Sequence, residues 1–465
     1  MKTLNERLNL AVKQGPNKAI EQHLKRGQLL VRDRIDLLLD EDSPFLELCP
    51  LAGWGQDGMT LGGSSVAGIG LVCGVECLIS GNVPTLFGGS SNEVSVAKGA
   101  RINTIACQNR LPLIQLIQTG GAKLEQQSKV FHPGGAHFRS LAERTKAGLP
   151  TCSIVFGSST AGGAYSPSLT DYIIMVKNQA QVFLGGPPLV QMATGEIVDA
   201  ESLGGADMHS RKSGVSDQLA LDEYDAIHKA REFISRLNWE KRGKIPQGHL
   251  VPKIDEPLYD IDELLGIVSA NIREPFDANE VINRIVDGSR FMAFKPLYGP
   301  NIITGWAAIH GKKYEEEGII KAGTHFVNAV SNSQVPAITI MMGASYGAGN
   351  YAMCGRTYNP RFLFSWPNSK CSVMGPDQLA GVMDIILHES AARAGKQVDE
   401  KVAARTKTFL SSRVEQESDV YWTTSRLLDD GVIDPRMTRV ILGFCLSVIY
   451  NEKVEGGSLG GVSRM

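Results

Sequence analysis

The chain has 465 residues, with 47 basic and 49 acidic side chains, and its formal net charge is −2. This length exceeds one ordinary hydrophobic core and predicts two domains of somewhat more than 200 residues each. The balanced charge provides no electrostatic surface for nucleic acid or an anionic membrane, and no apolar run approaches the roughly 18 residues of a membrane-spanning helix.

Residues 1–30 interrupt their apolar positions with charges, so we expect no secretory signal. The eight cysteines form no CxxC pair and lie mostly in apolar stretches, which predicts buried free thiols in a reducing compartment. We therefore expect a cytoplasmic protein, or a mitochondrial matrix protein if a eukaryotic transit peptide has been removed. The cysteine spacing lacks the four ligands of a zinc site, so no metal is expected on this chain.

The first motif along the chain is GWGQDG at 53–58, which has the glycine spacing of a dinucleotide-binding turn. No clear strand precedes it and no helix follows, so we expect a surface loop. His132 and His137 lie in FHPGGAHF without cysteine or carboxylate partners at metal spacing, and we interpret them as polar residues of a glycine loop. No phosphate loop, nucleophile elbow or catalytic triad follows from the spacing of residues.

Three short apolar runs rich in β-branched residues each end in a glycine turn. They are 111–117 before TGG, 152–156 before GSSTAGG and 338–342 before GASYGAG. A buried strand followed by a glycine turn and a helix is typical of an α/β fold. Because the runs are continuously apolar, we expect strands that are covered on both faces.

The sequence contains an internal repeat. LPTCSIVFGSSTAGGAY at 149–165 aligns without a gap with VPAITIMMGASYGAGNY at 335–351, at an offset of 186, and 182–190 resembles 371–379. Earlier, Gly68 and Gly74 match a second pair of glycines, Gly305 and Gly311. Three matches in one order, at so long a period, indicate two duplicated domains rather than a solenoid.

We place an N-terminal domain at 1–240 and a C-terminal domain at 241–465. The polar, proline-containing segment 239–260 separates a helical pattern at 221–237 from the second copy and is interpreted as a linker.

The second copy is shorter than the first by 51 residues, because the offset falls from 237 at Gly74 and Gly311 to 186 at Pro150 and Pro336. In the first copy this stretch carries FGGSS, a predicted helix and the strand and turn LPLIQLIQTGG. Deleting an internal strand and helix would leave a cavity and unpaired strand edges. We therefore expect that the complete protein carries this stretch after Gly311 and that the 465-residue sequence omits it; the alternative is a true deletion.

The repeated glycine turns are the strongest candidate site. They have the sequences AGGA at 161–164 and GAGN at 347–350. If a helix follows each turn, its first backbone N–H groups lack partners within the helix and can stabilise an oxyanion. The alternative, that the glycines only allow a tight turn or close packing, stays open at this point.

Several long motifs resemble a single family, in the right order from about residue 26 to the C-terminus. They are 26–48, 159–196, 203–217, 345–356 and 429–443. The chain resembles the carboxyltransferase (β) subunit of biotin-dependent acyl-CoA carboxylases. GAGNYAMCGR, PRFLFSWPN and the terminal SRM look most similar to the 3-methylcrotonyl-CoA type, which belongs to leucine catabolism. The zinc ribbon of the bacterial acetyl-CoA type is absent.

The resemblance implies a fold of two tandem crotonase-like (ClpP/crotonase) α/β domains. It implies a hexamer of β subunits, a trimer of dimers, with each active site between the N-domain of one subunit and the C-domain of another. It also implies an α subunit that carries the biotin carboxylase and biotin carrier domains. That subunit would use the ATP and hold the biotin covalently, and the substrate would be a coenzyme A thioester.

The implied reaction needs two oxyanions to be stabilised and no protein side chain as base. Carbon dioxide leaves carboxybiotin, the biotin ureido anion takes a proton from the acyl-CoA, and the thioester enolate attacks the carbon dioxide. By position, the N–H groups around Gly162 and Gly163 would hold the thioester oxyanion, and those around Ala348 and Gly349 the biotin oxyanion. Further residues expected to contact the substrates are Gly120, Gly121, Ala122, Ala164, Tyr165 and Gly347.

Two segments depart from the pattern of the family. Gln118 stands where many members have Asp before SGGA, which weakens the assignment of the 120–122 turn. FHPGGAHFRSL at 131–141 differs from the corresponding run of methylcrotonyl enzymes, in a region that helps to shape the acyl pocket. The acyl group therefore stays open, with geranyl, propionyl and longer or branched chains as alternatives.

Three other functions also stay open. The first is a biotin-dependent acyl-CoA decarboxylase coupled to sodium export, against which a requirement for ATP, bicarbonate and a soluble α subunit would argue. The second is a biotin-free hydratase or hydrolase, which usually needs an acidic residue beside the oxyanion site, and the glycine turns show none nearby. The third is a non-catalytic structural subunit, if the deletion after Gly311 is real.

Overall fold

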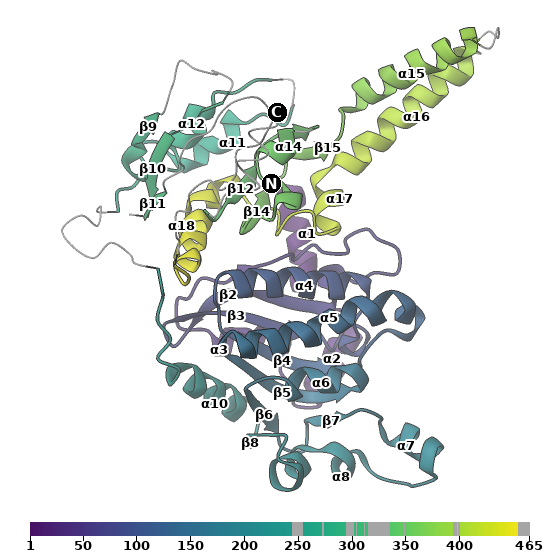
Figure 1. The fold of residues 1–465 in the computed structure, drawn as a ribbon, viewed down its shortest axis with the longest axis vertical. Coiled ribbons are helices and arrows are strands. Elements are labelled where there is room, and N and C mark those ends of the chain that lie inside the picture. The colour runs from purple at the N-terminus through teal and green to yellow at the C-terminus, as the bar shows by residue number, and fades with distance from the viewer. Residues whose placement is uncertain are drawn as a thin grey trace. The chain divides into compact units, whose positions relative to one another are not determined.

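The computed structural model (Figure 1) describes residues 1–243, 254–271, 274–293, 302–303, 305–310, 312–314, 335–347, 349–393, 398 and 400–453. The chain forms two compact units. We call residues 2–243 with 450–453 the N-terminal unit, and residues 244–449 the C-terminal unit. Gly311 and Ala348 lie outside the described residues.

An eight-stranded sheet forms the core of the N-terminal unit. Its order is β1-β2-β3-β4-β5-β6-β8, with β7 pairing with β5; β1 to β3 run antiparallel and the pairs from β3 onward run parallel. The strands are β1 (Leu46–Glu47), β2 (Ser65–Val72), β3 (Val75–Asn82), β4 (Leu113–Thr119), β5 (Thr151–Thr160), β6 (Tyr172–Val176), β7 (Gln181–Phe183) and β8 (Gln218–Ala220). The predicted α/β class is confirmed.

Helices cover this sheet. α4 and α5 lie side by side over the sheet and pack against each other. α3 and α10 pack against each other and against strands of the sheet (Figure 1). α4 begins where sequence chemistry dictates, because the Asn92 side chain accepts from the Ser95 N–H and the Ser95 hydroxyl accepts from the Asn92 N–H. The helices are α1 (Lys2–Val12), α2 (Asn17–Lys25), α3 (Val31–Leu38), α4 (Glu93–Gln108), α5 (Gln127–Lys146), α6 (Tyr165–Ser168), α7 (Pro187–Thr194), α8 (Ala200–Gly204), α9 (Ala206–Met208) and α10 (Glu223–Ser235).

The described part of the C-terminal unit has three small sheets, β11-β10-β9, β12-β14 and β13-β15. α15 and α16 form a long helical hairpin (Figure 1). The strands are β9 (Phe291–Ala293), β10 (Gly305–Ile309), β11 (Lys312–Tyr314), β12 (Ile338–Met341), β13 (Ala344–Tyr346), β14 (Phe362–Ser365) and β15 (Lys370–Ser372). The helices are α11 (Leu264–Ile267), α12 (Ala278–Asn283), α14 (Gly349–Ala352), α15 (Pro376–Arg393), α16 (Glu400–Ser418), α17 (Val420–Ser425) and α18 (Thr438–Ile449).

Strand pairing repeats in the two units at the offset found in the sequence. In the N-terminal unit β5 pairs with β6 at Cys152 and with β7 at Ser159. In the C-terminal unit β12 pairs with β14 at Ile338, and β13 pairs with β15 at Ser345. Ile338 and Ser345 are the residues that the sequence repeat aligns with Cys152 and Ser159, so the predicted duplication of one fold is confirmed.

A carboxylate caps the same β-turn in both units. Asp40 accepts from the Cys73 N–H (2.8 Å), and Asp287 accepts from the His310 N–H (2.9 Å). Cys73 and His310 have φ of 49° and 50°, so each turn passes through a left-handed residue that the cap supports. Each carboxylate also pairs with an arginine of a helix near the end of its unit, Arg231 of α10 and Arg439 of α18.

The two units differ where the second copy of the repeat is shorter. In the N-terminal unit β4 joins β3 to β5, whereas in the described part of the C-terminal unit no strand joins β11 to β12. β5 is buried along most of its length, but all four residues of β12 are only half-buried. β12 thus has the exposure expected of a strand without a neighbour on one edge among the described residues.

None of the helices in the described ranges is long and apolar enough to cross a membrane.

Candidate active site

The turn after β5 is the first candidate oxyanion site. A 3₁₀ turn at Ala161–Ala164 leads directly into α6. Ala161 has φ +54°, a conformation that costs a non-glycine residue free energy, and Gly347, its equivalent in the second copy, has φ +74°. Both copies therefore turn the chain through a left-handed residue at the same point, immediately before Gly162 in the first copy.

The backbone around Gly162 is accessible. Gly162 is exposed, Gly163 is half-buried and Ala164 is buried. The first N–H groups of a helical turn lack acceptors within that turn, and the Ser159 hydroxyl fixes this turn by donating to the Gly163 carbonyl at 2.9 Å. Since α6 has only four residues, its dipole adds little. The peptide N–H groups themselves are what this turn can offer a ligand oxygen.

The turn at 120–122 lies against this one, because a Cβ built on Gly121 would lie 3.0 Å from the Thr160 carbonyl oxygen. Its first two N–H groups are used within the fold. Gly120 donates to the Gly88 carbonyl (2.9 Å), and Gly121 donates to the Thr119 hydroxyl (3.1 Å). The expected contact of Gly120 and Gly121 with the substrate stays a prediction, and it would be made by their Cα surface, since both N–H groups already have acceptors.

Ala122 is the member of this turn that stays available. It forms an isolated parallel bridge with Ser91, in which Ser91 donates to the Gly121 carbonyl and accepts from Lys123. In such a bridge the N–H of the central residue points away from the partner strand. Ala122 is exposed, so its N–H is a candidate second donor beside the Gly162 turn.

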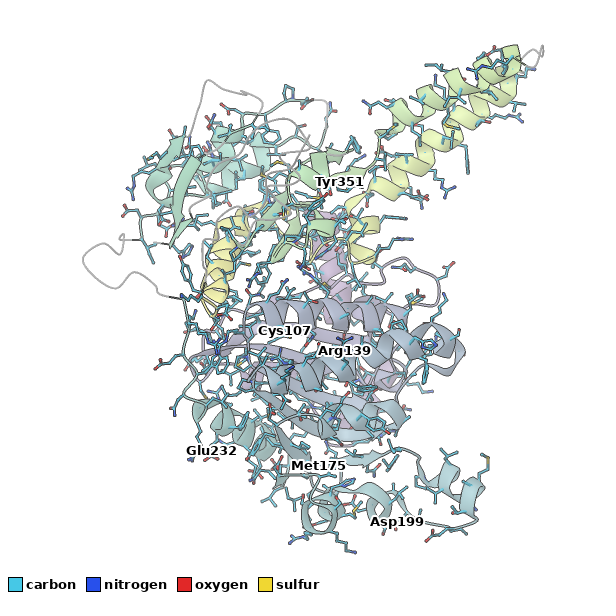
Figure 2. The ribbon with its side chains drawn as sticks, viewed as in Figure 1. Cys107, Arg139, Met175, Asp199, Glu232 and Tyr351 are labelled. Atoms are coloured by element: carbon cyan, nitrogen blue, oxygen red, sulfur yellow. The ribbon has the colours of Figure 1, made fainter. Side chains whose placement is uncertain are left out.

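The second turn resembles the first in its described residues. Gly347 donates to the Ser372 carbonyl at 2.9 Å, and α14 begins at Gly349. Asn350 donates to the Ser345 hydroxyl at 2.9 Å, which fixes the turn from the residue equivalent to Ser159. Tyr351 (Figure 2) is 46% exposed and Tyr165 is 48% exposed, so the equivalent tyrosines of both turns lie on the surface of their units.

Residues 131–141 form part of α5 and not the glycine loop that we expected. Pro133 removes one backbone hydrogen bond from the helix and so disfavours it, whereas Leu141, which is fully buried, holds the helix against the core. Phe138 lies at the Gly162 turn: its ring edge is 3.6 Å from a Cβ built on Gly162.

The aromatic wall of the site comes from α5 and α6. The rings of Phe138 and Tyr165 meet edge to face with centroids 5.7 Å apart. Burial lowers the pKa of His137 from its ordinary value, so this imidazole beside Phe138 is neutral at pH 7. The wall is thus apolar and uncharged on this side.

A cavity of about 400 Å³ opens beside Gly120. It is lined by α2, by the segment after β3 and by the carboxyl ends of β4 and β5; the lining residues are Ala19, Gln22, His23, Arg26, Pro84, Thr85, Gly88, Gln118, Thr119, Gly120 and Ser158. Burial lowers the pKa of His23, so the exposed Arg26 is the cation among these residues at neutral pH. Such a cavity suits a polar or anionic part of a ligand.

Sequence reasoning missed three residues that shape the site: Thr119, Ser159 and Phe138. Ser159 carried a usable signal, because Ser345 stands at the equivalent position of the second copy. Thr119 and Phe138 carried none, since their role depends on the approach of strands and helices that are distant in sequence.

The carboxyl transferase domain model matches residues 22–314 and 309–457. The chain is 48% identical over 509 residues to the probable biotin-dependent acyl-coenzyme A carboxylase β2 subunit of Mycobacterium tuberculosis, covering 99% of this chain and 95% of that protein. It is 43% identical over 519 residues to the probable mitochondrial methylcrotonoyl-CoA carboxylase β chain of Drosophila melanogaster, covering 98% and 89%. The β subunit of Pseudomonas aeruginosa geranyl-CoA carboxylase has a similar structure, with 34% identity, a TM-score of 0.86, and coverage of 99% of this chain and 94% of that one.

Proposed function

The chain belongs to the carboxyl transferase family, and from this premise we propose that it transfers a carboxyl group from carboxybiotin to the enolate of 3-methylcrotonyl-CoA. The observation that carries the proposal is the duplicated turn, which passes through a left-handed residue at Ala161 and again at Gly347. Relatives named methylcrotonoyl-CoA carboxylase β chain, from Drosophila melanogaster and Dictyostelium discoideum, support the choice of acyl group.

Each turn would hold one of the two oxyanions of the reaction. The N–H groups of Gly162 and Gly163, with that of Ala122, would hold the thioester oxygen while the enolate forms. The exposed, side-chain-free surface of Gly162 supports this role, since a ligand oxygen can reach the backbone there. By the repeat, the N–H groups of Ala348 and Gly349 would hold the ureido oxygen of biotin. When bound, carboxybiotin supplies the carboxyl group.

The cavity beside Gly120 would take part of the coenzyme A moiety. The guanidinium of Arg26, which lines this cavity, is suited to binding a phosphate group. Because burial lowers the pKa of His23, its imidazole is neutral and adds no charge to the cavity, so neutral polar groups can also bind there. We place the biotin covalently on the partner α subunit, with its biotin carboxylase and carrier domains, and assign no metal to this chain. The β chains would assemble as a hexamer.

A geranyl or other long acyl group is the second candidate substrate. A Cβ built on Gly135, in α5, would meet no atom within 4 Å, so this helix borders open space a turn away from Phe138. The similarity to the geranyl-CoA carboxylase β subunit also supports a longer chain.

We also infer that the active protein has a strand and a helix after Gly311. One support is that no described strand joins β11 to β12. Two further observations agree with it. The family model matches in two ranges that meet at 309–314. Because 99% of 465 residues is about 460, the 509-residue alignment with the mycobacterial protein leaves about 49 positions without a residue of this chain. A strand there would pair with the open edge of β12.

The test is a carboxylation assay with the biotin-carrying α subunit, ATP and bicarbonate, on a panel of acyl-CoA substrates. We expect the highest kcat/KM on 3-methylcrotonyl-CoA; a tenfold preference for geranyl-CoA would select the second candidate. Carboxylation by a chain with the segment after Gly311 restored, and none by the shorter chain, would support the missing strand. Carboxylation that needs neither ATP nor the α subunit would refute the carboxylase assignment.

A further inference from the structure

A buried ion pair lies beside the carboxyl ends of β4 and β5. Arg34 of α3 and Glu223 of α10 are 1% and 4% exposed. Arg34 Nε and Nη2 each lie 2.8 Å from one carboxylate oxygen of Glu223. Such a two-point contact fixes the orientation of both planar groups, and neither side chain can leave it without burying an unpaired charge. The pair is therefore a rigid point in the N-terminal unit.

One arm of this pair reaches the end of β4. Arg34 Nη1 donates to Gln118 Oε1 at 3.0 Å, and Gln118 Nε2 donates to Gln28 Oε1 at 3.2 Å. The next residue, Thr119, accepts from the Gly121 N–H and donates to the Gly89 carbonyl. A displacement of Gln118 would therefore also displace Thr119 and, through its hydrogen bond with Gly121, the turn at 120–122.

β5 carries an irregularity opposite Gln118. Ile117 pairs with Val155, but Thr119 pairs with Ser159, so residues 156–158 of β5 stand opposite a single residue of β4. Extra residues of this kind bend a strand and change the direction in which the chain leaves it. Here they redirect β5 toward the turn at Gly162 and Gly163.

The ion pair and Gln118 hold this irregularity from three sides. The Arg34 guanidinium lies 4.1 Å from the centroid of the Phe156 ring. Gln179 Nε2 donates to both the Phe156 carbonyl and Glu223 Oε1, each at 2.6 Å. The Gln118 side chain covers Gly157, where an added Cβ would lie 2.6 Å from Gln118 Nε2. A side chain at this point of β5 would displace Gln118.

The C-terminal unit shares only part of this arrangement. There the carbonyl of Met342, the equivalent of Phe156 in the repeat, accepts from Asn368 Nδ2 at 3.0 Å. Asn368 makes its other hydrogen bond to the Ser269 carbonyl, at 3.4 Å, and not to a carboxylate. The side-chain hydrogen bond to the strand carbonyl is therefore common to both copies of the fold. The Arg34–Glu223 ion pair belongs to the N-terminal unit, which carries the turns proposed to bind the acyl-CoA.

We propose that Gln118 is a positioning residue: anchored by Arg34 and Glu223, it sets the separation of the 120–122 and 161–164 turns, and so the placement of the donors at Ala122 and Gly162. This rests on the proposed function of those turns. Oxyanion donors act at about 2.7–3.1 Å from the oxygen. A shift of one strand end therefore weakens the stabilisation of the transition state more than it weakens the binding of the substrate. Gln118 thereby acts on the reacting atoms through the turns, and its contact with the cavity proposed for coenzyme A lies away from them.

Three variants test this proposal in the chain with the segment after Gly311 restored, in complex with the α subunit. Gln118→Ala removes the contact with Arg34. Gln118→Glu keeps an oxygen that accepts from Arg34 Nη1. The matched control is Gln115→Ala, three residues earlier in β4, which removes a buried hydrogen bond from the Ser153 hydroxyl (3.3 Å) without touching the anchor.

We expect Gln118→Ala to lower kcat by about 10- to 100-fold with KM changed by less than about threefold, and Gln118→Glu to recover most of this loss. Gln115→Ala should lower the melting temperature about as much as Gln118→Ala does, but it should leave kcat within about twofold of wild type. Equal loss of kcat in the two alanine variants, or kcat of Gln118→Ala within twofold of wild type, would overturn the proposal.

A second measurement separates this proposal from the proposed function. Backbone hydrogen exchange of the isolated chain should be faster at 119–122 and 160–165 in Gln118→Ala and unchanged there in Gln115→Ala. Faster exchange in Gln118→Ala, together with an inactive complex of the otherwise wild-type chain with the segment after Gly311 restored, would refute the carboxyltransferase assignment and support the positioning role. Unchanged exchange in Gln118→Ala would refute the positioning role.

Discussion

The substitution Gly163→Ala offers the sharpest test of how the first turn is built. A Cβ at this position would lie 2.9 Å from Thr119 Cγ2, the end of β4 next to the other turn. Carbon atoms normally pack at about 3.5–4.0 Å, so the two turns would have to separate by roughly 0.5–1 Å. Overpacking of this kind costs about 1–3 kcal/mol of folding free energy, and a displacement of about 1 Å at a reacting group costs on the order of 100-fold in rate.

The assay is kcat of the chain with the segment after Gly311 restored, in complex with the α subunit, together with the melting temperature of each variant. We expect Gly163→Ala to lose about 100-fold in kcat, and the added Thr119→Ser substitution to recover most of it, because serine removes the methyl group and keeps the hydroxyl that bonds Gly89 and Gly121. Gly162→Ala should leave the melting temperature unchanged, since its Cβ would meet Phe138 at an ordinary 3.6 Å. No recovery in the double variant would refute this explanation.

Three further predictions concern burial, strain and the aromatic wall. Burial raises the pKa of Asp429 to about 6 in the folded protein, from about 4 in the unfolded chain. The folding free energy gained by keeping Asp429 protonated is therefore complete below pH 4 and is lost as the pH rises through 6. Urea unfolding should therefore show Asp429→Asn gaining up to about 3 kcal/mol over wild type between pH 4 and 7, and a constant difference would contradict this. Ala161→Gly should raise stability by about 1 kcal/mol because it relieves the left-handed strain, and a loss would show that Ala161 is unstrained. Phe138→Ala should improve kcat/KM for geranyl-CoA relative to 3-methylcrotonyl-CoA, whereas an equal effect on both would place Phe138 outside the acyl site.

Much of the fold could be predicted from the sequence because its signals are local. The apolar runs that end in glycine turns correspond to β4, β5 and β12, and the repeat predicted the same strand pairing in both units. The segment 131–141 was assigned wrongly, since Pro133 and two glycines suggested a loop. Packing of the buried Leu141 against the core outweighs those local preferences and keeps the segment in α5.

The site could be predicted only in part, for a different reason. The sequence indicated which turns matter, but not which N–H groups are already used, as Gly120 and Gly121 show. Nor could it indicate the anchor, because Arg34 and Glu223 are 189 residues apart, and the motif 26–48 that contains Arg34 does not reveal its partner. Their pairing depends on how α3 and α10 pack together, which no local pattern encodes.

The reverse reaction is the most direct measurement of the central claim, because it needs no α subunit. The chain with the segment after Gly311 restored is mixed with 3-methylglutaconyl-CoA and free biotin, and release of 3-methylcrotonyl-CoA is followed. We predict release that depends on biotin and falls by about 100-fold in Gly163→Ala. Release that is the same with and without biotin, or that Gly163→Ala leaves unchanged, would contradict a carboxyltransferase acting at these glycine turns.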